Sequence, residues 1–195
     1  MSGQDVRVDS LVVKEMKKNK DLRFSASIDT GYYNAKSGVT TRTFVLRNII
    51  TKFLEKDNTN TTIKSWNDFP RNFPILRVAD VYLLYAEALI RNGKSAMAKE
   101  YIDKIRTRAG LPALAESPVL DDIKKERKME FIGEGKRYFD LVRWGDADAI
   151  ATLSAFATKY HSNTNGQLPT KKDLLLPIPQ TELNARSNWL QNEGY

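Results

Sequence analysis

Two segments with helical periodicity, joined by a very short connection, constrain the fold of this chain more than any other feature. In the first, apolar residues recur at three- and four-residue spacing and share one helix face: Val78, Val81, Tyr82, Tyr85, Ala86 and Leu89. The second begins at Ser95, and its apolar face holds Met97, Ala98, Tyr101, Ile102 and Ile105. Asn92-Gly93 predicts the end of the first helix, because glycine adopts the left-handed conformation of a C-cap. The connection is only about three residues long, so we expect an antiparallel helix hairpin.

Further helices are predicted downstream. The pattern predicts one helix from about Pro118 to Gly133, a second from about Lys136 to Trp144, and a third from about Asp146 to Tyr160. The tail contains two prolines and cannot be one long helix, and its "LLLPIP" stretch is typical of extended, buried chain. Two helix hairpins suggest stacked pairs of the tetratricopeptide kind. The repeat signal is weak, because the hairpins start about 43 residues apart, against roughly 34 for the regular repeat.

The first part of the chain is less regular. A short helix is expected from Ser10 to about Lys18, with Val12, Val13 and Met16 on its apolar side. The stretch "TRTFVLRNIITKFL" favours one or two short strands or an extended segment. The Asn/Thr-rich stretch that follows predicts a long loop. We therefore expect one domain, 1–195, that is mostly α-helical: 1–75 irregular and loop-rich, and 76–195 made of tetratricopeptide-like stacked helix pairs plus an extended tail.

Composition excludes several kinds of site. The 195 residues are 41% hydrophobic and 28% charged, as in ordinary globular proteins. The net charge of +7 is more typical of a solvated surface than of nucleic-acid binding. There is no cysteine, which excludes disulfides, cysteine-based zinc sites and a cysteine nucleophile, and the single histidine, His161, lies in a polar stretch. We expect no metal and no cofactor. No signal-peptide pattern opens the sequence, and no apolar run approaches the ~18 residues of a membrane span.

The stretch "EGKRYFDLVRWGD", 134–146, combines dense charge with aromatic rings. Glu126, Glu130 and Glu134, the last of which opens this stretch, recur every four residues, and like charges at that spacing repel unless cations neutralise them. The sequence offers three nearby arginines for this role: Arg127, Arg137 and Arg143. The alternative, a catalytic carboxylate pair, needs a general acid with a raised pKa, whereas neighbouring cations lower carboxyl pKa values. We therefore interpret the stretch as a structural ion network and predict no catalytic residue.

Aromatic residues in polar, turn-rich segments are the better functional candidates. Tyr32, Tyr33 and Trp66 lie where no apolar periodicity forces their burial. Flat rings beside amide and carboxylate groups suit sugars, which present apolar C–H faces and hydroxyl edges. The alternative is that these aromatics only anchor their loops to the helices. The predicted ligand contacts are Tyr32, Tyr33, Trp66, Asn67 and Asp68.

Four blocks, in order along the chain, resemble the C-terminal part of the SusD/RagB family. They are "PILRVADVYLLYAEALIRNG", "AKEYIDKIRTRAGLP", "IKKERKMEFIGEGKRYFDLVRWGDA" and "LLLPIPQTELNARSNWLQNEGY". The stretch "KNKDLRFSASI" resembles the start of the same family domain. The resemblance implies a mostly α-helical, tetratricopeptide-like protein at the surface of the outer membrane of Bacteroidetes-type bacteria. It implies a lipoprotein that binds a glycan or another nutrient, without being an enzyme, and forms a lid on a SusC-like TonB-dependent transporter.

The sequence departs from the family in two ways. Family members are considerably longer, with an N-terminal helical half, and they carry a lipidated cysteine. We therefore expect a fragment or a shortened homologue, attached to the membrane only through a lipid anchor that this chain does not contain. The hypotheses are a glycan- or nutrient-binding accessory protein, a helical-repeat scaffold for protein–protein contacts without its own ligand, and, least favoured, a glycoside hydrolase.

Overall fold

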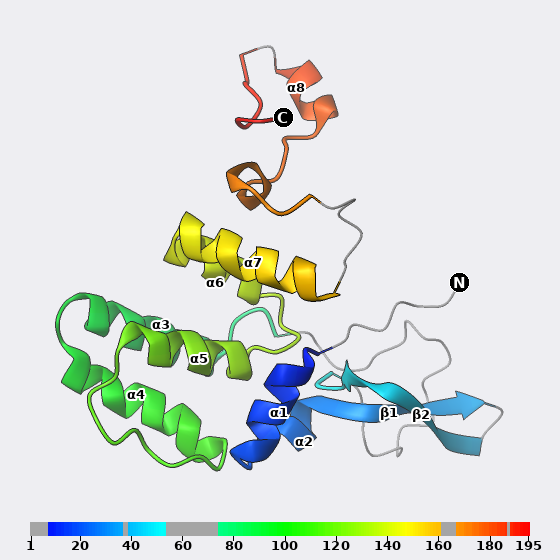
Figure 1. Ribbon diagram of the computed structural model, residues 1–195, viewed down its shortest axis with the longest axis vertical. Helices are drawn as coiled ribbons and strands as arrows, with labels where there is room; N and C mark the ends of the chain where they lie inside the picture. The colour runs from blue at the N-terminus through cyan, green and yellow to red at the C-terminus, as the bar shows by residue number, and fades with distance from the viewer. Residues whose placement is uncertain (1–7, 37–38, 54–73, 161–166, 187) are drawn as a thin grey trace. The chain divides into compact units, whose positions relative to one another are not determined.

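The computed structural model describes residues 8–36, 39–53, 74–160, 167–186 and 188–195. The chain divides into two compact units, Met1–Gly135 and Lys136–Tyr195 (Figure 1). Helices dominate both units, and the only sheet in the described parts of the chain is a two-stranded hairpin. Within these described residues, no helix is both long and apolar enough to cross a membrane.

The first unit contains the expected helix hairpin. Helices α3, Val78–Arg91, and α4, Ser95–Arg108, run antiparallel, and α5, Leu120–Glu130, packs against them (Figure 1). At the turn, Gly93 has a φ of 71° and the Lys94 amide donates to the Leu89 carbonyl oxygen at 2.8 Å, as the C-cap signal predicts. The core between the helices consists of Ala79, Leu83, Ala86, Leu89, Ala98, Ile102, Ile105, Ile123 and Phe131. The prediction of a mostly α-helical fold with stacked helix pairs is confirmed.

The predicted buried face of α3 is partly wrong. Val78, Val81 and Tyr85 are 63%, 59% and 46% exposed. The residues that α3 buries are Ala79, Asp80, Leu83, Ala86, Glu87 and Leu89. Apolar residues surround most of this helix, so periodicity alone does not select one face. Two carboxylates also belong to the buried side, and each binds an arginine there: Asp80 pairs with Arg127 and Glu87 with Arg91.

The N-terminal part of this unit combines two helices with the hairpin. Helix α1, Ser10–Lys18, is capped by Asp9 and buries Val12, Val13 and Met16, as predicted. Helix α2, Arg23–Ser27, leads into β1, Ile28–Lys36, which pairs antiparallel with β2, Val39–Ile50. Strand β2 confirms the interpretation of the β-branched stretch. Strand β1 was not predicted, because "IDTGYYNAK" has no simple alternation of apolar and polar residues.

The second unit contains α6, Arg137–Trp144, and α7, Asp146–Tyr160, both close to their predicted bounds. A short 3-10 helix, η1, Lys171–Leu174, and helix α8, Gln180–Ala185, follow. The small core of this unit is formed by Leu141, Ala149 and Leu174.

The tail is not buried as predicted. Leu174 is buried, but Leu175 and Leu176 are 56% and 77% exposed. The tail is held by polar contacts to its backbone instead of by apolar packing. Gln191 both donates to and accepts from the backbone of Ile178, at 2.9 Å and 2.8 Å, and Asn192 donates to the Leu176 carbonyl oxygen at 2.7 Å.

Candidate functional site

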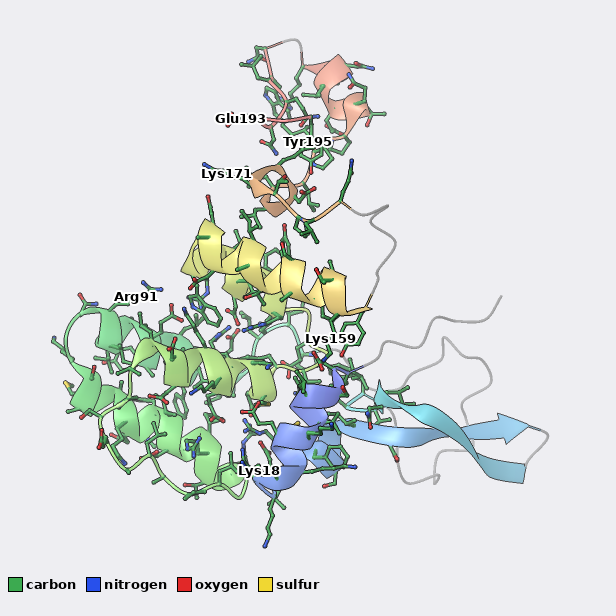
Figure 2. All side chains as sticks on the ribbon, in the orientation of Figure 1. Lys18, Arg91, Lys159, Lys171, Glu193 and Tyr195 are labelled. Carbon is green, nitrogen blue, oxygen red and sulfur yellow. The ribbon has the colours of Figure 1, made fainter. Side chains whose placement is uncertain are left out.

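Three buried carboxylates on and just after α5 are the centre of a charge network in the first unit. Glu126, Glu130 and Glu134 have almost no solvent exposure. Their four-residue spacing places them along one side of the helix and the turn that follows it. Side chains fill the space between α5 and the α1–α2 segment (Figure 2). The cations that pair with the three carboxylates come from elsewhere in the chain: Arg23, Lys52, Arg77, Arg106 and Arg108.

Glu130 and Glu134 share their main partner. Arg77 donates from Nε and Nη2 to the two carboxylate oxygens of Glu134, at 2.8 and 2.6 Å, and from Nη1 to Glu130 Oε1 at 2.6 Å. Lys52 Nζ also donates to the Glu134 carboxylate, and to the backbone oxygen of Glu130 at 2.8 Å. Arg108 and Arg23 form further ion pairs with Glu130. Such fork-like arginine–carboxylate geometry favours a fixed arrangement of the segments that carry these groups.

Glu126 occupies the other end of the network. Arg23 Nη1 donates to Glu126 Oε1 at 2.6 Å, and Arg106 Nη1 lies 3.3 Å from Oε2. Arg23 also binds the Asp21 carboxylate through Nε and Nη2, with Nη2 at 2.6 Å from Oδ2. The network therefore links α5 to the segment that leads into β1.

The prediction of an ion network is confirmed, but its predicted cations are wrong. Arg127 pairs with Asp80 at 2.8 Å, and Arg143 with Asp140 at 3.0 Å. Arg137 belongs to the other unit, where its guanidinium lies over the Trp144 ring, 5.6 Å from the centroid. The actual partners lie up to 107 residues away in sequence. Helical spacing identifies the carboxylates but cannot indicate partners brought in by tertiary folding.

The network keeps the Glu130 carboxylate ionised. Burial alone disfavours the charged form of Glu130, but the hydrogen bonds and charges of Arg77 and Arg108 outweigh it and lower the pKa of this carboxyl. Burial lowers the pKa of Lys52, although Glu134 opposes that effect. A carboxylate with a lowered pKa is a poor general acid. In the described part of the chain, no cluster of histidine and acidic residues has the arrangement of a metal site.

The predicted ligand contacts lie in two segments of the first unit. Tyr32 and Tyr33 lie on β1, opposite Thr43 and Arg42 of β2, so they belong to a strand and not to the loop that we expected. Backbone pairing with β2 gives this stretch a regular conformation that its polar, glycine-containing sequence did not indicate. Trp66, Asn67 and Asp68 lie outside the described residues.

The network holds the ends of the segments that carry these candidates. Arg23 begins α2, which leads directly into β1. Lys52 follows β2, and Arg77 immediately precedes α3. The Thr51 amide also donates to the Ser27 carbonyl oxygen at 2.8 Å, which joins the two strands at the base of the hairpin. Sequence reasoning missed this supporting role, because single lysines and arginines in polar segments carry no signal of burial.

Known proteins resemble this chain in sequence and in fold. The model of the SusD family matches residues 2–195. The chain belongs to the SusD family. It is 31% identical over 125 residues to the starch-binding protein SusD of Bacteroides thetaiotaomicron, covering 64% of this chain and 22% of that protein. It is 32% identical over 170 residues to SusD-like protein P25 of Formosa agariphila, covering 76% of this chain and 31% of that protein.

Solved structures of the SusD type share this fold. Surface glycan-binding protein A of Bacteroides thetaiotaomicron superposes with a TM-score of 0.71 at 27% identity, over 96% of this chain and 41% of that one. The protein of the same name from Bacteroides uniformis gives 0.69 at 27% identity, over 95% and 40%. The chain therefore spans about a fifth to a third of the curated relatives and about two fifths of these structures.

Proposed function

We propose that this chain is part of a non-catalytic accessory protein that binds a glycan or another nutrient for a TonB-dependent uptake system of the outer membrane. The observation that carries the proposal is the SusD-family match over residues 2–195. Its relatives include a protein named for starch binding and two named for glycan binding, all at 27–31% identity. The partner we propose is a SusC-like transporter, and the location is the cell surface.

Ligand contacts in this chain are proposed at Tyr32, Tyr33, Trp66, Asn67 and Asp68. A tyrosine or tryptophan ring gains free energy mainly by burying the apolar face of a sugar ring, on the order of 1–3 kcal/mol per ring at ~25 cal/mol per Å². Amide and carboxylate groups beside the rings can exchange hydrogen bonds with sugar hydroxyls. The described residues that flank these two segments, Arg23, Lys52 and Arg77, bind acceptors on and just after α5.

The lack of catalysis is proposed from the state of the carboxylates. The acidic residues on and just after α5 pair with arginine and lysine, and these cations lower the pKa of the Glu130 carboxyl. Hydrolysis of a glycosidic bond needs one carboxyl that can donate a proton. Release of reducing ends from a glycan that the chain binds would contradict this part of the proposal.

The binding site is tested by calorimetry with a glycan first selected on a glycan array. Trp66→Ala and Tyr33→Ala are expected to weaken binding about 5- to 100-fold each while leaving the melting temperature nearly unchanged. Tyr160→Ala is the matched control, because this tyrosine is exposed and belongs to the end of α7 in the other unit. Binding unchanged in both site variants would refute the assignment. Early melting of those variants would favour their interpretation as loop anchors.

A scaffold for protein contacts is the second candidate. The exposed Val78, Val81 and Tyr85 on α3 favour it, because helix pairs of the repeat type bury such faces against neighbours. A chain that binds no glycan on the array but is captured by the transporter would favour this second function.

A further inference from the structure

A cavity of about 370 Å³ opens in the first unit, between the start of α3 and the end of α4. Three cations, Arg77, Lys104 and Arg108, line it together with Tyr82 and apolar side chains. Among the described residues that line the cavity, none is acidic. Its volume is at the lower end of the range of small-molecule sites, which suits one sugar unit better than a large ligand.

The cations of the cavity have donors that the protein does not use. Arg108 shares its acceptor, because its Nη2 and Arg77 Nη1 both donate to Glu130 Oε1. Within the described residues, Arg108 Nε and Nη1 have no hydrogen-bond partner, and the side chain is 57% exposed. Lys104 Nζ donates to Glu100 Oε1 at 2.6 Å, and an ammonium group has three donors, so two remain. The cavity can therefore donate charge-assisted hydrogen bonds to an anion.

Tyr82 gives the same cavity an aromatic side. Its ring contacts the Tyr101 ring edge to face, with 5.6 Å between the centroids, and Lys104 Nζ lies 5.4 Å from its own centroid. Ala79 and Ile105 are buried and add apolar atoms to the lining. A ring beside cations matches a sugar acid, whose C–H face is apolar and whose acidic group accepts hydrogen bonds.

We infer that this cavity is a subsite for the acidic group of a sugar, either the carboxylate of a uronic acid or the ester of a sulfated sugar. A further helix pair fits this place less well, because it would bury the charges of Lys104 and Arg108 away from water. The assignment to a sugar rests on the proposed function, whereas the affinity for an anion rests on the cavity alone. The subsite uses none of the five ligand contacts proposed above.

The test is an NMR titration of the chain with four probes: D-glucuronate, D-glucose 6-sulfate, D-glucose and inorganic sulfate. Both sugar acids are expected to shift the amides of Val78, Tyr82, Ile105 and Arg108, with dissociation constants on the order of millimolar because the probes are small. D-glucose lacks the charge and inorganic sulfate lacks the apolar face, so each should bind the cavity at least about fivefold more weakly. The sugar acid that binds more tightly identifies the preferred acidic group.

Two lysines of α4 provide a matched comparison. Lys104 pairs with Glu100 and Lys99 with Asp103, each four residues away, but of the two lysines only Lys104 lines the cavity. Lys104→Gln is expected to weaken the binding of both sugar acids about fivefold or more, because it removes a charged donor. Lys99→Gln is expected to leave that binding within about twofold of the parent. The Lys104 side chain is 47% exposed, so its variant should melt like the parent.

Tyr82→Leu separates the ring from the charge. It is expected to weaken the binding of both sugar acids about fivefold, while inorganic sulfate, which needs only the cations, stays within about twofold of the parent. Tyr82 also packs against the core of the first unit. Lys104→Gln therefore decides the inference if the tyrosine variant melts early.

The outcomes separate this subsite from the proposed function. No shift at the four amides with either sugar acid, or equal losses in Lys104→Gln and Lys99→Gln, would overturn the inference. Inorganic sulfate that binds as tightly as the sugar acids would overturn the assignment to a sugar. A chain that binds neutral glycans on the array, but neither sugar acid at the cavity, keeps the proposed function and loses this subsite. A chain that binds no array glycan, but both sugar acids at the cavity, contradicts the proposed function and keeps the subsite.

Discussion

At the scale of single residues, Gly133 shows how tightly the end of α5 meets the hairpin. Its φ is 79°, a left-handed conformation that residues with a side chain rarely adopt, and a Cβ placed there would lie 2.6 Å from Cγ2 of Ile50. Ile50 is the last residue of β2, two positions before Lys52. A single glycine thus permits the close approach that brings Lys52 to Glu134.

Gly133→Ala is expected to destabilise the chain by about 2–4 kcal/mol, the sum of left-handed strain and a clash with the hairpin. Gly93→Ala is the control. Its φ is 71°, but its Cβ would meet nothing within 4 Å, so the expected cost is only about 1 kcal/mol of strain. Urea unfolding of both variants measures the difference. Equal losses would show that the contact with Ile50 adds no cost.

Side-chain partners were the features that the sequence predicted least well. The four-residue spacing of the α5 glutamates predicted an ion network, because it depends only on local geometry. Which cations complete it depends on tertiary folding, and Arg77 is 53 and 57 residues from its two carboxylate partners. For Tyr32 and Tyr33 the sequence suggested a loop, whereas backbone pairing with β2 places them in a strand.

At the scale of elements, helix bounds were predicted well because capping and periodicity are local. Helix α4 begins at Ser95 and α7 spans Asp146–Tyr160, as the sequence indicates. The buried side of α3 was predicted less well. The buried side of this helix includes Asp80 and Glu87, and burying a carboxylate is costly unless a cation pairs with it. Their arginine partners offset that cost, but a pattern of apolar residues does not include these pairs.

The lowered pKa of Glu130, on α5, predicts how the stability of the chain depends on pH. Its folded-state pKa lies below the ordinary value of 4.5, so the folded state binds fewer protons than the unfolded state in that range. The stabilisation is present above pH 4.5 and is lost as the pH falls through the folded-state pKa. We expect the free energy of unfolding to decrease progressively below about pH 4.5.

Unfolding by urea at a series of pH values measures this loss. Glu130→Gln is the comparison, because it removes the titrating group and should flatten the profile below pH 4.5. A parent profile that is flat in this range, or a variant profile as steep as that of the parent, would contradict the assignment to Glu130.

At the scale of the whole molecule, the described residues expose many large apolar side chains. On α3 these include Val78, Val81 and Tyr85, and Met97 of α4 is also exposed. In the second unit they include Leu176 and Leu190. The chain spans only about two fifths of the solved SusD-type structures that share its fold. Because stacked helix pairs bury their faces against neighbouring pairs, a chain containing few pairs leaves such faces in water.

The chain by itself is therefore expected to bind a fluorescent dye that reports exposed apolar surface. Val81→Lys should reduce the dye signal with little change in melting temperature, because this position is 59% exposed and its charge would remain solvated. Leu83→Ala is the opposite case. Leu83 lies on the same helix but is fully buried, so its truncation should lower stability by about 2–5 kcal/mol. A parent chain that binds no dye, or a Val81→Lys variant that melts as early as Leu83→Ala, would show that the outer face of α3 is packed.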